Sequence, residues 1–403
     1  MIQSLICILI LLIPTIGVVA GLSAATTISL FLAMVLFALR YELRFKHFIS
    51  HRKLEITFLF WCFVTIFYST NTWYAIATYM QVLVIVLAGL LIHDNIEQTS
   101  LDISRIKKYF ITGVIIGIIL LCLEYLSGGM ITITVRSIIQ PTLTNIFAWT
   151  NLDRGCALLS VISWVILAIL IQYRKYVLAI GYYFVILYLL YLSDSLASFV
   201  AFIGGGFVFS ISRLSMTSTM LKTAFFRLFI IGIFSGSILM PIISYKMQPL
   251  NIIEASHSYL PDSAKHRLFI WHFVAEKIVE KPVFGYGWGA SKNFPVEENE
   301  MIRYRGEEIW SPLPLHPHNN VIQVIFETGI IGFCLFILLI YKNLLLVYMA
   351  KNDTIGADCK SIYYACFTNY YIIGMISFSI WQAWWVSVAI LAACLMRLFV
   401  RQT

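Results

Sequence analysis

Residues 314–332 read PLHPHNNVIQVIFETGIIG, and they join a polar cluster to an apolar run that continues to about residue 341. Two histidines with a proline between them and two asparagines form the polar part. An apolar run of about 20 residues matches the hydrocarbon thickness of a bilayer. The stretch therefore predicts a membrane-spanning helix with titratable side chains at its entrance.

The rest of the chain repeats this apolar pattern. Its 403 residues are 60% hydrophobic and only 12% charged. A water-soluble fold of this length cannot bury so much apolar surface, whereas lipid solvates it. We expect an all-α polytopic membrane protein with about twelve transmembrane helices. The expected spans are residues 2–20, 24–39, 54–70, 73–92, 109–127, 155–172, 176–192, 196–212, 226–245, 319–341, 361–379 and 381–397.

Lysine and arginine are concentrated in alternate connections between these spans, which predicts that both termini are cytoplasmic. Residues 1–245 then hold nine helices, residues 246–318 form one long loop on the outer side, and residues 319–403 hold three helices. The net charge of +8 is in this interpretation a topology signal, so we expect no nucleic-acid partner.

Cysteines and histidines give little support for a disulfide or a metal site. None of the eight cysteines falls in the long loop, so we expect no disulfide framework there. His316 and His318 form an H-x-H pair, which without a partner carboxylate at a known spacing is a weak zinc signal. We expect no metal and no cofactor.

One amphipathic helix is expected inside the long loop. Asp262 or Ser263 can cap a helix that runs to about Lys281 and stops at Pro282. Arg267 shares a face of this helix with apolar residues such as Trp271. An arginine in that position either extends to lipid headgroups or binds a buried anion.

The segment GYGWGAS, residues 285–291, follows this helix. Its spacing differs from that of phosphate-binding glycine loops, and no strand precedes it. We expect a flexible turn with Tyr286 and Trp288 at the membrane interface. Stacking of the two rings on sugars is the alternative.

The two histidines of the opening stretch have two interpretations. They cap the following helix or bind headgroups, or they perform acid–base chemistry, because an imidazole titrates near neutrality and can accept the proton of a hydroxyl. At an outward-facing helix entrance, such a base would meet a lipid-linked substrate.

These features together resemble the O-antigen ligase and O-antigen polymerase superfamily of bacterial envelope glycosyltransferases. The matching residues are Arg267 on a loop helix, the Pro- and Gly-rich turn KPVFGYGWG, and His318-Asn319 nine residues before Gly329-x-x-Gly332. The resemblance is strongest over about residues 180–335.

The resemblance implies a GT-C-like, multi-pass protein of the bacterial inner (plasma) membrane with a periplasmic active-site loop. It implies a metal-independent, inverting glycosyltransferase that moves a glycan from undecaprenyl pyrophosphate, embedded among membrane lipids, to lipid A–core in lipopolysaccharide biosynthesis. His318 would be the general base and Arg267 would bind the donor pyrophosphate. Gly329 and Gly332 would let a neighbouring helix pack closely.

One residue departs from the family pattern. Ligases often carry a second arginine before the loop, and here YLSDSLASF has Leu196 at that place. Arg154 is the expected substitute on the pyrophosphate; the alternative is an arginine that pairs with Asp153 or extends to the interface. Further candidates for substrate contact, each with a structural or solvated alternative, are Asn319, His316, Asp194, Tyr286, Trp288, Arg303 and Arg305.

Three functions are compatible with this pattern. A ligase is favoured because the histidine–glycine pattern is complete and the loop is single. A polymerase that joins lipid-linked repeat units is the alternative within the superfamily. A polysaccharide or lipid transporter is the alternative from another class, but the chain shows no convincing repeat and few charges inside its spans.

Overall fold

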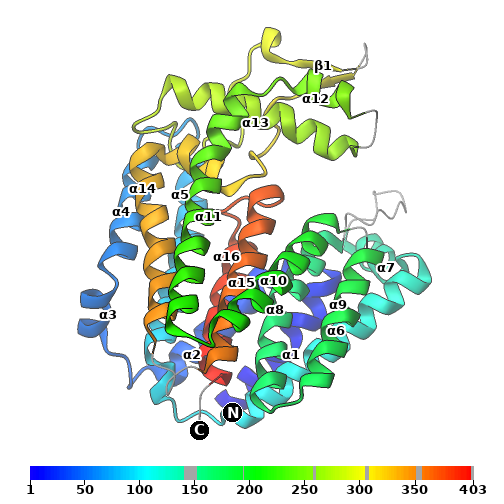
Figure 1. The fold of residues 1–403 in the computed structure, drawn as a ribbon, viewed down its shortest axis with the longest axis vertical. Coiled ribbons are helices and arrows are strands. Elements are labelled where there is room, and N and C mark those ends of the chain that lie inside the picture. The colour runs from blue at the N-terminus through cyan, green and yellow to red at the C-terminus, as the bar shows by residue number, and fades with distance from the viewer. Residues whose placement is uncertain (140–151, 194, 257–259, 305–307, 351–355, 401–403) are drawn as a thin grey trace.

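The computed structural model describes residues 1–139, 152–193, 195–256, 260–304, 308–350 and 356–400. These residues form a helical bundle with one extramembrane-type segment at its end (Figure 1). The helices are α1 (Ile2–Val19), α2 (Ser23–Leu39), α3 (Phe45–His51), α4 (Lys53–Ile66), α5 (Thr72–Asn95), η1 (Ile96–Gln98), α6 (Ile103–Ser127), α7 (Met130–Ile139), α8 (Asp153–Gln172), α9 (Tyr176–Leu192), α10 (Leu196–Ser215), α11 (Thr219–Lys246), α12 (Pro249–Ala255), α13 (Asp262–Glu280), η3 (Glu298–Glu300), α14 (Asn320–Met349), α15 (Ala357–Ile376) and α16 (Ala383–Phe399). A short antiparallel ribbon of β1 (Ile302–Tyr304) and β2 (Glu308–Trp310) lies between η3 and α14.

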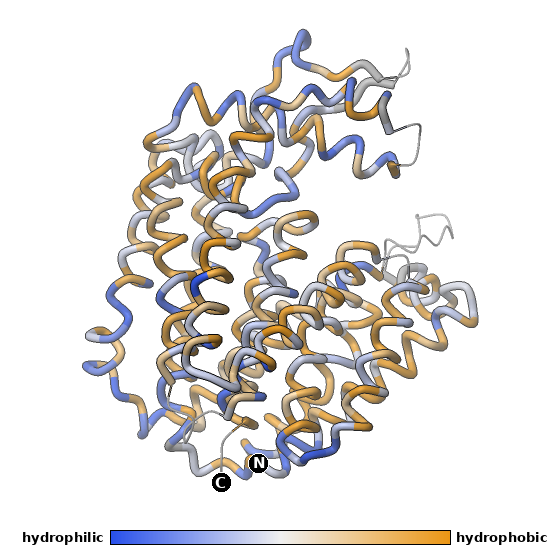
Figure 2. The backbone as a smooth tube through the Cα atoms, viewed as in Figure 1, coloured by the Kyte–Doolittle hydropathy of each residue, from blue (hydrophilic) through white to orange (hydrophobic). Residues whose placement is uncertain are grey.

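The helices confirm a multi-pass membrane protein. Seven of the described helices are long and apolar enough to cross a bilayer, and α2, α9 and α16 are shorter apolar helices. Figure 2 shows hydrophobic residues along the bundle and hydrophilic ones gathered towards its two ends. Each of the expected spans coincides with a helix, while the number that cross the membrane stays a prediction.

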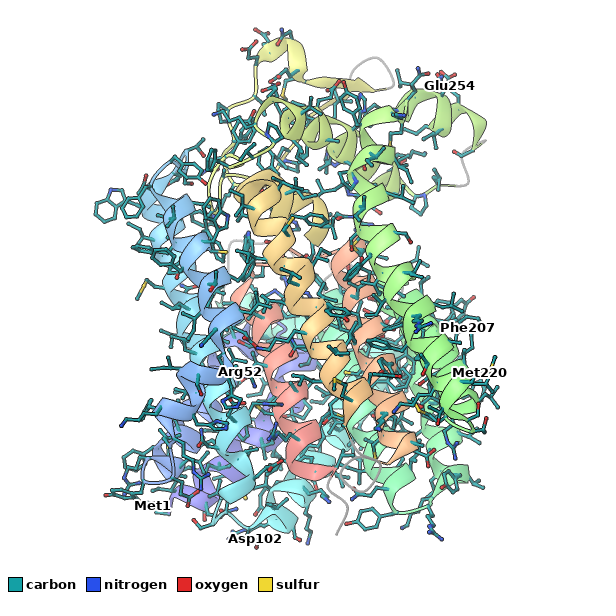
Figure 3. The ribbon with its side chains drawn as sticks, turned by 60° about the vertical axis from the view of Figure 1, so that its left-hand side comes forward. Met1, Arg52, Asp102, Phe207, Met220 and Glu254 are labelled. Carbon is teal, nitrogen blue, oxygen red and sulfur yellow. The ribbon has the colours of Figure 1, made fainter. Side chains whose placement is uncertain are left out.

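The two ends of the bundle differ. Both chain termini lie together at one end, and α12, α13 and the ribbon lie at the other (Figure 1). Met1 and Asp102 mark the first end and Glu254 the second in Figure 3. The long loop therefore lies on the opposite side of the bundle from both termini.

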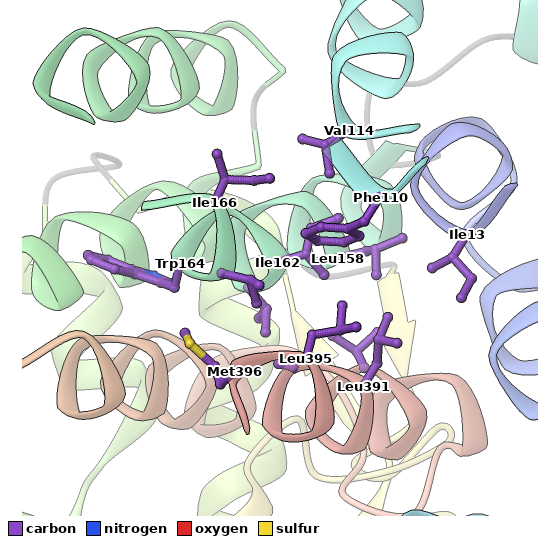
Figure 4. Close-up of a cluster of buried hydrophobic side chains, with 14 of the residues drawn as sticks. Ile13, Phe110, Val114, Leu158, Ile162, Trp164, Ile166, Leu391, Leu395 and Met396 are labelled. Carbon is purple, nitrogen blue, oxygen red and sulfur yellow. The ribbon is translucent and has the colours of Figure 1, made fainter. Parts of the chain in front are cut away.

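Helix α8 is the centre of the largest apolar core. Of the 18 residues in its most apolar stretch, 83% are buried inside the protein. Its side chains Leu158, Ile162 and Trp164 pack among residues of α1, α6 and α16 (Figure 4). At Gly155 a side chain would overlap the carbonyl oxygen of Val18, so the glycine lets the start of α8 approach the end of α1. This contact places the start of α8 at the loop end of the bundle.

Helix α13 differs from expectation at its start. It begins at Asp262, with Pro261 as the capping residue and no side-chain cap, so the predicted cap at Asp262 or Ser263 is wrong. Asp262 already lies inside the helix, where its carboxylate pairs with the ammonium of Lys265 at 2.9 Å. The helix ends at Glu280, just before Pro282, which confirms the predicted stop.

Helix α14 is broken at Gly329, whose φ of 66° and ψ of −172° are open to glycine alone. The break exposes backbone groups that pair with the preceding loop. The N–H groups of Tyr286 and Gly287 donate to the carbonyls of Phe326 and Glu327 at 2.8 and 2.9 Å. Gly329 therefore serves a helix break. Gly332 fits the expected close packing, since a side chain there would come 3.2 Å from Trp61 on α4.

Candidate active site

One face of helix α13 contacts the His-Pro-His segment, residues 316–318. The indole Nε1–H of Trp271 donates to the carbonyl of Pro317 at 2.9 Å, which ties the helix to the residue between the two histidines. Arg267 lies one turn earlier on the same face. Its half-buried guanidinium makes no hydrogen bond or ion pair with the residues that the structure describes. Burial lowers the pKa of Arg267 and the negative charge of Asp153 raises it, so Asp153 lies within electrostatic reach.

His318 is held in one tautomer. Its Nδ1 lies 2.6 Å from the carbonyl oxygen of Ser377, just after α15. A carbonyl can only accept, so Nδ1 carries the proton and Nε2 keeps a free lone pair. The backbone of His318 has a φ of 54°, a conformation that is costly for a side chain with a Cβ and is common at functional sites.

His316 is held in the opposite tautomer. Its Nδ1 accepts from the backbone N–H of His318 at 3.1 Å, so the proton of the neutral ring is on Nε2. The two ring centroids are 4.1 Å apart. The segment thus presents one acceptor nitrogen and one donor nitrogen side by side.

Both histidines are neutral at pH 7. Burial lowers the pKa of His318 to about 4; the Ser377 hydrogen bond opposes this, and the charges of Arg267 and His266 add to it. Burial lowers the pKa of His316 to about 3, together with the charges of His318, Arg267 and Arg154. A neutral imidazole is the form that can accept a proton.

Arg154 joins the same site from the first turn of α8. Its charge acts on His316, and a side chain at Gly21 would overlap its Cβ, so the turn between α1 and α2 supports it. The structure therefore gathers Arg154, Arg267, His316 and His318 at the loop end of the bundle, although they come from three separate parts of the chain.

Asn319 lies in the fold as a helix cap. Its Oδ1 accepts from the N–H of Ile322 at 3.0 Å, and its Nδ2 donates to the carbonyl of Met375 at 2.9 Å. The side chain is fully buried. Its role in the structure is to fasten the start of α14 to the end of α15.

Tyr286 and Trp288 pack in the protein interior instead of the membrane interface, and their contact with a sugar stays a prediction. Tyr286 stacks on Phe326 with 4.9 Å between ring centroids, and Trp288 stacks on Trp381 with 3.9 Å. Their exposed fractions are 8% and 0%. The positive φ angles of the surrounding glycines fold this loop onto the broken α14, which withdraws both rings from the protein surface.

The remaining candidates are placed as follows. Asp194 and Arg305 lie outside the described residues, and so does the side chain of Arg303, whose backbone belongs to β1.

Glu327 is a buried carboxylate that the sequence interpretation overlooked. It lies on α14 and is fully buried. It accepts hydrogen bonds from the Gly289 N–H at 2.5 Å, the Trp381 indole at 2.8 Å, the Gln323 amide at 3.0 Å and the Ser291 hydroxyl. The sequence alone could have singled out Glu327, because an acidic residue inside a predicted membrane helix is by default a candidate functional residue.

Comparison with known proteins decides the family. The family model described as O-antigen ligase matches residues 181–337. A protein of Rickettsia felis with the name "Putative polysaccharide ligase" is 40% identical, over 99% of this chain and 98% of its own length. The chain belongs to the O-antigen ligase family. Proteins of the same name from Rickettsia conorii and Rickettsia typhi are 40% and 39% identical over the same shares of both chains.

The O-antigen ligase match runs from within α9 into α14. It contains Arg267, the glycine-rich loop, both histidines and Glu327, whereas Arg154 precedes it. The family assignment favours a lipid-linked polysaccharide substrate over the cargo of a transporter.

Proposed function

We propose that this protein is an O-antigen ligase that moves a polysaccharide from undecaprenyl pyrophosphate onto lipid A–core. The observation that carries the proposal is the juxtaposition of Arg267 with a neutral His318 whose Nε2 is free to accept a proton. The membership in the O-antigen ligase family supports the substrate class.

His318 is the general base of the proposed reaction. Its Nε2 takes the proton from the acceptor hydroxyl while that oxygen attacks the anomeric carbon of the donor sugar. The bond between this carbon and the pyrophosphate oxygen breaks, and the pyrophosphate leaves with the electron pair. A single displacement of this kind inverts the anomeric configuration.

The surroundings of His318 suit the charge that forms on it. The Ser377 carbonyl accepts from Nδ1–H at the end of α15, where the helix dipole is negative. An imidazolium is stabilised there. The bound pyrophosphate also offsets Arg267, whose charge disfavours protonation of His318 in the free protein.

The leaving group is held by donors. Arg267 and Arg154 supply positive charge, and the Nε2–H of His316 supplies a neutral donor beside them. The reaction as proposed uses neither a metal nor a nucleotide sugar, because pyrophosphate is already a good leaving group once its charge is held.

The proposed setting is the bacterial inner membrane, with both termini cytoplasmic and the loop periplasmic. The position of the loop at the opposite end from both termini supports this topology.

The test is a gel of lipopolysaccharide from cells that lack the gene and carry wild type, His318→Ala or His272→Ala. His272 is the matched control because its Nδ1 contacts the Ser244 carbonyl, away from the histidine pair. We expect bare lipid A–core in the deletion strain, rescue by wild type and by His272→Ala, and no rescue by His318→Ala. A core that carries a single repeat unit in the deletion strain would identify a polymerase. A normal ladder with His318→Ala at wild-type protein level would overturn the assigned base.

A further inference from the structure

Glu327 lies in a membrane helix, and the proposed reaction does not use it. An ionisable side chain in such a place is costly unless it is fully paired. Its Oε2 faces the Gly289 N–H and the Trp381 indole, and its Oε1 faces Gln323 and Ser291. The carboxylate is thus surrounded by donors from the glycine-rich loop, from α14 and from the segment between α15 and α16.

The hydrogen-bond directions require an acceptor at this position. The Gln323 amide is oriented by its Oε1, which accepts from the Ile380 N–H at 3.3 Å, so its NH₂ group faces Glu327. The indole and the backbone N–H of Gly289 can only donate. An amide at position 327 would turn an NH₂ group towards these donors and leave buried donors unpaired.

Residues 377–381 connect this carboxylate to the histidine. Near α16, the segment is held by Glu327 through Trp381 and by Gln323 through Ile380. Near α15, the Ser377 carbonyl receives the Nδ1–H of His318. Because that bond selects the tautomer, the position of this segment decides which ring nitrogen has the free lone pair.

We propose that Glu327 is a positioning residue that holds residues 377–381 so that the Ser377 carbonyl keeps His318 in its Nδ1–H tautomer. This rests on the proposed function, since it assigns the base role to His318. Glu327 does not touch the substrate and acts through the Trp381 and Gln323 contacts.

The first variant is Glu327→Gln in the full-length protein in lipid nanodiscs, assayed with undecaprenyl-pyrophosphate-linked polysaccharide and lipid A–core. We expect kcat to fall about 10- to 100-fold, as for other outer-shell hydrogen-bond partners. The donor KM should stay unchanged because Arg267 is untouched. The acidic limb of the pH profile should move below about pH 4, since the Ser377 hydrogen bond raises the pKa of His318 and its loss leaves burial and the charge of Arg267 unopposed.

The charged groups around His318 are the same in this variant. Arg267 and His266 face it from α13, His316 from its own segment, and Arg154 acts on His316 from α8. A shift of the acidic limb relative to wild type therefore reports a change in the position of the His318 ring.

The second variant is Gln323→Met, which cuts the link to Ile380 and leaves the other donors of Glu327 in place. We expect the same shift of the acidic limb with a smaller loss of kcat. In protein labelled with ¹⁵N-histidine, the His318 signals should change from protonated Nδ1 in wild type to a mixture of tautomers. This variant decides the question if Glu327→Gln does not fold.

Arg52→Ala is the control for general destabilisation, because Arg52 lies between α3 and α4 and pairs with Asp94 near the end of α5, remote from the loop. It should lower thermal stability without moving the acidic limb. Wild-type kcat and limb in both Glu327→Gln and Gln323→Met, with His318→Ala inactive, would overturn this inference and leave the proposed function standing. Wild-type turnover by His318→Ala would instead overturn the proposed function.

Discussion

At the scale of single residues, two histidines of one short segment have opposite tautomers. His318 donates through Nδ1 to Ser377, and His316 accepts through Nδ1 from the backbone of His318. The same side-chain type therefore presents an acceptor nitrogen and a donor nitrogen side by side, and the difference comes from which partner each Nδ1 meets.

The pH dependence follows from the burial of His318. Its pKa is lowered to about 4, so the neutral, competent form persists as pH falls and is lost only below that value. We expect kcat/KM to be flat on its acidic side down to about pH 5 and to fall about tenfold per unit below about pH 4. Circular dichroism at each pH checks that the protein stays folded. A midpoint near 6.5 would contradict the buried, charge-flanked position.

Arg267→Gln removes a positive charge that acts on His318. We expect the donor KM to rise about 10- to 100-fold, because a charge-assisted hydrogen bond contributes about 1.5–3 kcal/mol. The acidic limb of the pH profile should also move upward, because the charge that lowers the pKa of His318 is gone. Arg267→Lys keeps the positive charge but lacks the planar guanidinium group. This variant should restore the position of the acidic limb more fully than the donor KM.

Arg154→Ala tests the substitute for the missing family arginine. We expect the donor KM to rise about tenfold or more, since the loss concerns a contact to the pyrophosphate. Lys175→Ala is the control, because Lys175 follows the other end of α8. A donor KM equal to that of wild type in Arg154→Ala would remove this residue from the site.

At the scale of elements, the break in α14 joins the membrane bundle to the loop. The backbone released at Gly329 lets the loop pair with residues 326–327, and the N–H of Ile330 donates to the carbonyl of Pro282 at 2.9 Å. Because both halves of α14 are otherwise helical, the break places Glu327 against the loop and keeps His318 at the helix entrance. The glycine-rich segment, residues 285–291, is thereby packed into the protein core.

Gly329→Ala should destabilise this joint. The backbone conformation is disfavoured for alanine, and its Cβ would overlap the carbonyl oxygen of Val283. We expect a loss of about 2–3 kcal/mol in the free energy of unfolding, measured in detergent. Gly236→Ala is the matched control, since a Cβ on that residue of α11 meets nothing within 4 Å. Equal stability of the two variants would argue against the break as a structural requirement.

At the scale of the whole molecule, a buried ion network fastens the end remote from the site. Arg52 pairs with Glu55 at 2.9 Å and with Asp94 at 2.5 Å, and Lys342 of α14 pairs with Glu55 at 2.7 Å. The network joins α4, α5 and α14. Helix α14, which begins at the proposed active site, is thus held at both ends.

Arg52→Ala should lower the free energy of unfolding by about 3–5 kcal/mol, because it leaves the buried carboxylate of Glu55 and the largely buried carboxylate of Asp94 with one cation fewer. Arg213→Ala, which breaks the more exposed pair with Asp358, should cost less than about 1 kcal/mol. Thermal unfolding of both variants in the same detergent provides the comparison. A similar cost for both would show that burial does not strengthen the network.

The membrane class, the positions of the helices and the main chemical groups of the proposed site could be predicted from the sequence. Lipid imposes its requirement on each segment separately, because every spanning backbone must bond within its own helix and present apolar side chains. Arg267 and His318 could likewise be found because each sits in a local pattern, an amphipathic helix and a polar helix entrance.

How these parts meet could be seen only in the folded protein. The tautomer of His318 depends on Ser377, the setting of Glu327 depends on Trp381, and the burial of Trp288 depends on both Trp381 and the break at Gly329. These partners are far apart in the chain, and hydropathy or spacing within one segment carries no information about them. Hydrogen-bond direction and burial are properties of the packed interior, so the proposed roles of base, donor and positioning residue required the fold.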